Sequence, residues 1–160
     1  LRAQSDGVAT GVGWLPSSPI SFTVNGFVGD RSVTSDSAGG FNFPLASIGL
    51  GFEPGDFLSA SDGVTTRQIV IPFVTVDTFD LDLGVASGTA SLPDGSSIEL
   101  RIIGSTPAEA LSQLQTTIQN GAWSFAIEPI SPEQTIIESW ISIVSGNGLF
   151  EIRLAPTGRT

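Results

Sequence analysis

The chain of 160 residues carries a net charge of −10 and contains no Cys, His, Met or Tyr, and all six of its basic residues are arginines. The negative charge disfavours binding to nucleic acid or to an anionic membrane surface, and the missing Cys excludes disulfides and thiol chemistry. Charged residues make up only 14% of the chain. No apolar run approaches the ~18 residues of a membrane span. The low charge therefore reflects either a compositional bias or a surface that packs against copies of itself.

The first predicted strand, at residues 7–16, is repeated at residues 84–93. The two stretches read GVATGVGWLP and GVASGTASLP, and their offset of 84 − 7 = 77 residues is about half of the chain. This repeat predicts two tandem domains, residues 1–78 and residues 79–160. A domain of about 80 residues buries only a modest fraction of its surface, so we expect each copy to be stabilised by its neighbour or by other subunits.

The next strand of each copy is predicted by an alternation of period two. Apolar residues at 20, 22 and 24 alternate with polar residues up to Gly26, and apolar residues at 98, 100 and 102 do the same before Gly104. Such strands are half-buried, with the apolar side chains on one face.

An aromatic hairpin follows in both copies. Phe41 and Phe43 in the first copy match Trp123 and Phe125 in the second. The pair Asn120-Gly121 predicts a type I′ turn, in which both central residues need a positive φ. We expect these aromatics to be core anchors, and the short strands with frequent turns predict an all-β fold of antiparallel sandwiches.

One stretch departs from this pattern. Residues 106–109 read Thr-Pro-Ala-Glu, which is typical of a capped helix start, and Leu111, Leu114 and Ile118 have helical spacing. The sequence therefore predicts a short helical insertion near 107–113.

The joint between the copies, residues 73–83, is predicted to be a strand. Phe79, Leu81 and Leu83 alternate with two aspartates. Asp77, Asp80 and Asp82 form the densest acidic cluster of the chain. They are either solvated side chains on the polar face of this strand or the ligands of an inter-domain calcium ion.

The turn motifs resemble those of bacterial immunoglobulin-like repeats and of the related carboxypeptidase-regulatory-like (transthyretin-like) sandwiches, which occur in secreted and cell-surface proteins. The matching motifs are LPDG at 92–95, Asp-x-x-Gly-x-Phe-x-Phe at 36–43 and Pro-Gly-Asp at 54–56, whereas the second copy has Pro-Glu-Gln at 132–134 in place of the last. This resemblance implies two tandem Ig-like β-sandwiches in a secreted protein. Members of these families serve as spacers, adhesive stalks and subunits of surface fibres.

The side chains that remain offer little chemistry. Without His, Cys, Lys and Tyr the chain can form neither a Ser-His-Asp triad nor a His-based metal site, and its carboxylates fall mostly in turns. We therefore expect no enzymatic activity, no cofactor and no resident metal apart from the calcium alternative. Trp14 aligns with Ser91, so the shared core does not need it, and it is predicted to be the most exposed Trp. It serves either as a buried or interface residue or as a platform that stacks on a sugar.

The strand before residue 84 has no counterpart before residue 7, where only six residues precede the repeat. Either the chain is a piece of a longer array, or it is a subunit whose terminal strands pair with the next copy. The second account predicts a secreted, cell-surface filament that assembles head to tail from copies of this chain. The alternative is an adhesin, carbohydrate-binding or spacer module of a larger multi-repeat protein, with surface glycans as partners. No Asn-x-Ser/Thr sequon is present, so attached glycans would be O-linked.

Overall fold

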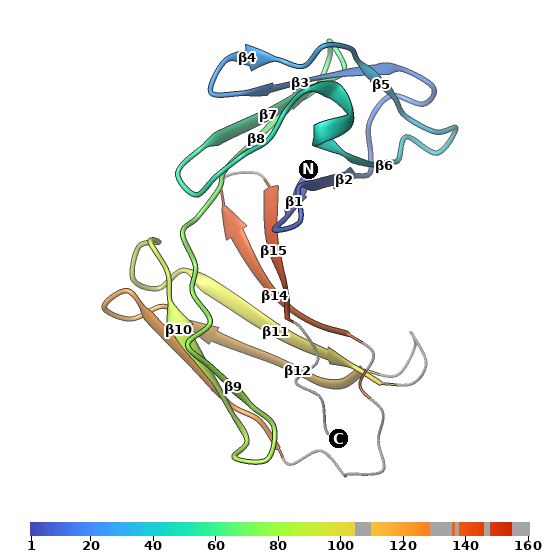
Figure 1. The fold of residues 1–160 in the computed structure, drawn as a ribbon. Coiled ribbons are helices and arrows are strands. Elements are labelled where there is room, and N and C mark those ends of the chain that lie inside the picture. The colour runs from blue at the N-terminus through green and yellow to red at the C-terminus, as the bar shows by residue number, and fades with distance from the viewer. Residues whose placement is uncertain (105–109, 129–135, 137, 146–147, 155–160) are drawn as a thin grey trace. The chain divides into compact units, whose positions relative to one another are not determined.

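The computed structural model describes residues 1–104, 110–128, 136, 138–145 and 148–154, and nearly all of its regular structure is β (Figure 1). The chain divides into two compact units. Unit 1 comprises Leu1–Pro72 with Val144–Glu151, and unit 2 comprises Phe73–Ile143 with Ile152–Thr160. The prediction of an all-β fold with several antiparallel sheets is confirmed, whereas the two Ig-like domains at 1–78 and 79–160 stay a prediction.

Unit 1 contains two sheets. In one sheet β3 (Pro19–Val24) pairs with β4 (Phe27–Val28), β5 (Val33–Thr34) and β7 (Phe57–Ser61), and β7 pairs with β8 (Thr66–Val70), all antiparallel. In the other sheet β2 (Val8–Gly11) lies between β1 (Arg2–Gln4) and β6 (Phe41–Pro44). A short 3-10 helix, Leu45–Ile48, follows β6. No helix among the described residues is long and apolar enough to cross a membrane.

The core of unit 1 lies between these two sheets. The alternation predicted at 20–24 is confirmed, because Ile20, Phe22 and Val24 are all buried. The Phe22 ring meets two rings of β6 edge-on, with centroid distances of 5.4 Å to Phe41 and 5.0 Å to Phe43. Aromatic pairs favour this geometry, so the two sheets are joined by the residues that the hairpin motif predicted as anchors.

Unit 2 also contains two groups of paired strands. β10 (Val85–Thr89) pairs with β9 (Thr78–Asp80) and β13 (Ala122–Ala126), and β11 (Ser97–Ile103) pairs with β12 (Ala110–Thr117) and β14 (Glu138–Ser145), all antiparallel. Trp123 and Phe125 are buried, as are Ile98, Leu100 and Ile102 of β11. At the predicted type I′ turn, Asn120 and Gly121 have φ values of 52° and 73°, which confirms that prediction.

Gly11 and its counterpart Gly88 have the same role in the two copies of the opening strand. An added Cβ at Gly11 would come within 2.7 Å of the Phe41 ring, and one at Gly88 would come within 2.7 Å of the Trp123 ring. The hairpin aromatic of each copy therefore packs directly on a backbone that carries no side chain. This close approach explains why both copies have Gly at this position.

Two predictions of local structure are wrong. Residues 105–109 of the predicted helix lie outside the described residues, but residues 110–113 belong to strand β12. There the backbone pairs with β11, and the amides of Gln113 and Gln115 donate to the Glu99 carboxylate at 3.2 and 3.1 Å. The strand predicted to run to residue 83 ends instead at Asp80. Its carboxylate Oδ1 accepts hydrogen bonds from the backbone N–H groups of Asp82 and Leu83 at 2.9 and 2.8 Å, which turns the chain.

Candidate functional site

The edge of unit 1 at β1 is completed by a strand from far along the chain. β15 (Gly148–Leu154) pairs with β1 in parallel, and its register places Arg2 opposite Leu149, Ala3 opposite Phe150 and Gln4 opposite Glu151. Backbone hydrogen bonds flank this register, from Leu149 N–H to the Leu1 carbonyl at 3.0 Å and from Ser5 N–H to the Glu151 carbonyl at 2.9 Å. We call residues 148–151 the inserted strand.

The Glu151 side chain fixes the register of the inserted strand. One carboxylate oxygen lies 3.3 Å from the Arg2 guanidinium, and the other accepts a hydrogen bond from the Gln4 amide at 3.3 Å. Glu151 is only 8% exposed. A buried carboxylate is costly unless it is paired and hydrogen-bonded, so this contact selects one alignment of the two strands over others.

Phe150 anchors the inserted strand in the core of unit 1. Its side chain is buried, and its ring meets Phe52 edge-on at a centroid distance of 6.5 Å. Gly148 enters at a point that has no room for a side chain, because an added Cβ would lie 2.8 Å from the Leu1 carbonyl oxygen and 3.2 Å from the Ile69 Cβ. The strand thus combines main-chain pairing, an aromatic anchor and a charge contact, which are the components of strand addition to a sheet edge.

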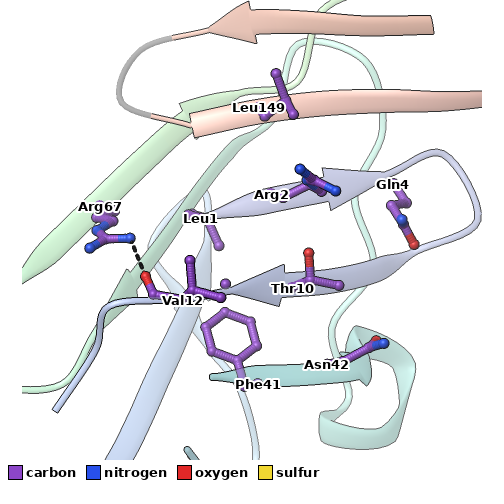
Figure 2. Close-up of a pocket in the computed structure, with 10 residues that line it drawn as sticks. Leu1, Arg2, Gln4, Thr10, Val12, Phe41, Asn42, Arg67 and Leu149 are labelled. Carbon is purple, nitrogen blue, oxygen red and sulfur yellow. Dashed lines mark hydrogen bonds between the residues drawn. The ribbon is translucent and has the colours of Figure 1, made fainter. Parts of the chain in front are cut away.

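Beside the inserted strand lies a hollow of about 510 Å³, which Figure 2 shows from the side of β1 and β2. Leu149 lines one side of it, and Thr10, Phe41 and Asn42 line the other. A second hollow of about 420 Å³ shares Gly11, Val12, Phe41 and Asn42 with the first.

Arg67 borders the first hollow, but its hydrogen bonds hold a loop in place. Its Nη1 and Nη2 atoms donate to the carbonyls of Val12 and Gly13 at 2.8 and 3.0 Å, and its guanidinium lies 4.8 Å from the Trp14 ring centroid. Both arginines of the hollow, Arg2 and Arg67, therefore have partners within unit 1.

Trp14 was predicted to be the most exposed Trp, and this prediction is wrong. Its side chain is 4% exposed, and its ring lies 5.8 Å from the Phe41 ring. The alignment with Ser91 indicated only that the shared core does not need a Trp here. In unit 1 the extra ring fills the space between the loop and β6, which matches the alternative of a buried residue.

The three aspartates of the joint are not gathered around one point. Asp80 uses its carboxylate in the turn after β9, and Asp77 and Asp82 are exposed. Within the described residues no group of three or more His, Cys, Asp or Glu side chains could hold a metal ion. The geometry therefore favours turn and solvated roles for Asp77, Asp80 and Asp82 over calcium ligation.

The residues of the inserted strand were not singled out by the sequence. The prediction that the strand before residue 84 has no counterpart before residue 7 is wrong, because β1 pairs with β2 as β9 pairs with β10. The repeat also did not indicate that residues 148–151 add a further strand beside β1. A usable signal is the run Leu149-Phe150-Glu151, in which a large aromatic is followed by an acid that can pair with the basic Arg2.

No family model matches this sequence, and no curated protein matches it either. Among solved structures, a tetra-tandem repeat from the extending region of a large adhesion protein is 17% identical with a TM-score of 0.37, over 92% of this chain and 44% of that chain. A Ca²⁺-stabilised adhesin that helps an Antarctic bacterium bind ice is 16% identical with a TM-score of 0.35, over 94% of this chain and 45% of that chain. The CD2-binding domain of CD58 is 8% identical with a TM-score of 0.32, over 100% of this chain and 98% of that chain. The structural neighbours thus include repeat modules of adhesins, while the fold described above stands on the strand pairings of this chain alone.

Proposed function

We propose that this chain is a non-enzymatic extracellular structural protein, and that its copies assemble head to tail into a surface filament by exchanging the inserted strand. One observation carries the proposal. Unit 1 receives a strand whose Phe150 lies 150 − 3 = 147 residues after its partner Ala3. A contact so distant in sequence does not depend on which copy of the chain supplies the strand.

The contacts of the inserted strand are the same whether the strand comes from its own chain or from a second copy. The backbone hydrogen bonds, the Phe150 anchor and the Arg2–Glu151 ion pair use atoms that every copy presents. Exchange of an identical element between copies has a low thermodynamic cost, and head-to-tail exchange that does not close gives a filament. At high local concentration we therefore expect exchange to compete with the closed form.

The chemistry of the chain supports a structural role outside the cell. The residue inventory lacks His, Cys, Lys and Tyr, which supply most general bases and activated nucleophiles. The turn motifs resemble those of repeats in secreted and cell-surface proteins. The low density of charge suits a surface that is partly covered by other copies.

Paired cysteine variants test the exchange, because the natural chain has no thiol. Gln4→Cys and Glu151→Cys place the two thiols on register partners. Two single variants, when mixed and oxidised, are expected to give a disulfide-linked heterodimer, and the double variant is expected to give a ladder of oligomers. Single variants oxidised alone control for chance homodimers. In a second control, Gln4→Cys is mixed with Asp94→Cys, whose thiol lies on an exposed turn, in place of Glu151→Cys. A double variant that forms only a crosslinked monomer, together with mixed single variants that never crosslink, would refute the filament.

That outcome would support the second candidate, a spacer or binding module of an adhesin-like protein. One observation favours it: in the structure the inserted strand comes from the same chain, so unit 1 is already complete. A closed monomer fits a spacer in a multi-repeat protein. A glycan array probed with the intact chain then separates a binding module from a passive spacer.

A further inference from the structure

We propose that the outer face of the sheet β3–β7–β8 in unit 1 is a packing surface for the same face of a second copy. We call it the neutral face. Its polar side chains are all uncharged and lie on alternate positions of the three strands: Ser21, Thr23, Ser59, Ser61, Thr66 and Gln68. The registers align Ser21 with Ser61 and Thr66, and Thr23 with Ser59 and Gln68, so these side chains form continuous rows.

The absence of charge on this face is unusual for this chain. The sequence carries 6 basic and 16 acidic residues, and the only one on these three strands is Arg67. Arg67 lies on the opposite face, where it bonds to Val12 and Gly13. Apolar side chains add to the neutral face, since Phe57 is 38% exposed and its register partner Val70 is 47% exposed, and Val28 on β4 is 68% exposed.

The matching face of unit 2 provides the contrast. The aligned strand β11 has Glu99 where β3 has Ser21, and Arg101 where β3 has Thr23, and both charged side chains lie on the outward face. The same fold position therefore accepts charged residues, so the neutral composition in unit 1 is not required by the fold. It is a property of that surface.

Electrostatics favours a second copy of this chain as the partner of the neutral face. Two copies that each carry a charge of −10 repel one another, and the repulsion is smallest where neither surface is charged. A basic partner would be drawn to the acidic remainder of the chain instead. The small side chains at the centre of the face allow two sheets to approach closely, at about the 10 Å that separates packed sheets.

The size of the face indicates a weak contact that acts through repetition. Three strands of five or six residues cover about 14 by 17 Å, or about 240 Å² for each copy, against the ~800 Å² of a stable interface. A single contact is therefore transient. It becomes effective when many copies are held in line, so this inference rests on the proposed filament, where it predicts side-by-side bundling.

Salt and two single substitutions test the inference. Electron microscopy of the intact chain is expected to show more bundled filaments as salt rises, because screening removes the repulsion between the acidic surfaces. Ser21→Glu and Thr23→Arg install the residues that unit 2 has at the aligned positions, and each is expected to reduce bundling about tenfold, since each would bury an unpaired charge. They change the net charge in opposite directions, so an effect of net charge alone would raise bundling in one variant and lower it in the other. Making them singly keeps the test informative if one variant fails to fold, and melting curves check the folding of each.

The double variant Glu99→Ser with Arg101→Thr in unit 2 keeps the net charge and serves as the control, which should bundle as the natural chain does. If filaments bundle equally in all variants, or bundle less at high salt, the proposal that the neutral face is a packing surface is wrong. That result would not contradict the proposed filament. If only monomers form, the filament fails. The face is then judged by sedimentation at rising concentration. Association that increases with salt and is lost in Ser21→Glu and Thr23→Arg supports it, and ideal monomer behaviour refutes it.

Discussion

At the scale of single residues, one carboxylate connects a turn to a distant loop. Asp62 Oδ2 accepts a hydrogen bond from the Leu15 backbone N–H at 2.9 Å, and Oδ1 accepts from Val64 and Thr65 at 3.0 and 2.7 Å. These bonds, with that from Leu15 the largest cause, lower the pKa of Asp62 below its ordinary value of 3.8. The charged form is therefore favoured by folding.

The pH dependence of Asp62→Asn follows from this direction. A lowered pKa contributes stability that is fully present above the unfolded pKa of about 4 and is lost as the pH falls through the folded pKa. We expect the variant to melt at a lower temperature than the natural chain at neutral pH, and the difference to shrink as the pH falls below about 4. Melting curves across this range measure it, with Asp94→Asn as a control for loss of a surface charge. A difference that does not change with pH would contradict the role of Asp62.

The paired glycines predict unequal costs for one substitution. At Gly88 an added Cβ would meet the backbone carbonyl of Thr75, which cannot move without breaking the pairing around it. At Gly11 the obstacles are side-chain atoms of Trp14 and Phe41, which can shift. We expect Gly88→Ala to lower the free energy of unfolding by about 3 kcal/mol or more and Gly11→Ala by about 1 kcal/mol. Denaturant titration measures both, and equal costs would show that the two sites are equally rigid.

At the scale of elements, the strands and turns that were predicted correctly are those whose sequence signal lies in neighbouring residues. The alternations at 20–24 and 98–102 and the turn at Asn120-Gly121 depend on neighbouring residues, and the structure has them as predicted. The short helix failed because the capping pattern at 106–109 is local, whereas β12 is held by pairing with β11. The inserted strand had no local signal, since its register with β1 is set by Phe150 and Glu151 meeting residues near the other end of the sequence. Trp14 was misplaced because an alignment of copies does not show which loops fold over a ring.

The turn after β9 carries the prediction for calcium. The Asp80 Oδ1 atom accepts two backbone hydrogen bonds, and within the described residues no group of three or more acidic side chains could hold a metal ion. We expect calcium addition to leave the melting temperature of the natural chain unchanged. Asp80→Ala is expected to lower the melting temperature by the same amount with and without calcium, with Asp82→Ala as a neighbouring control. A rise in melting temperature with calcium that disappears in Asp80→Ala would establish the metal site.

At the scale of the whole molecule, β15 is divided between the two units, because residues 148–151 belong to unit 1 and residues 152–154 belong to unit 2. Residues 149–151 pair with β1 in unit 1, and Leu154 is buried in the core of unit 2. Unfolding of either unit therefore removes support from a strand that the other needs, and we expect a single cooperative transition despite the duplicated sequence.

Leu100→Ala, at a fully buried position of unit 2, should lower the free energy of unfolding by about 2–5 kcal/mol and reduce the hydrogen-exchange protection of Arg2–Gln4 in unit 1. Phe22→Ala, the aligned position in unit 1, should in turn reduce the protection of β11. Calorimetry with two separate transitions, of which Leu100→Ala shifts only one, would show that the units unfold independently and that the inserted strand does not couple them.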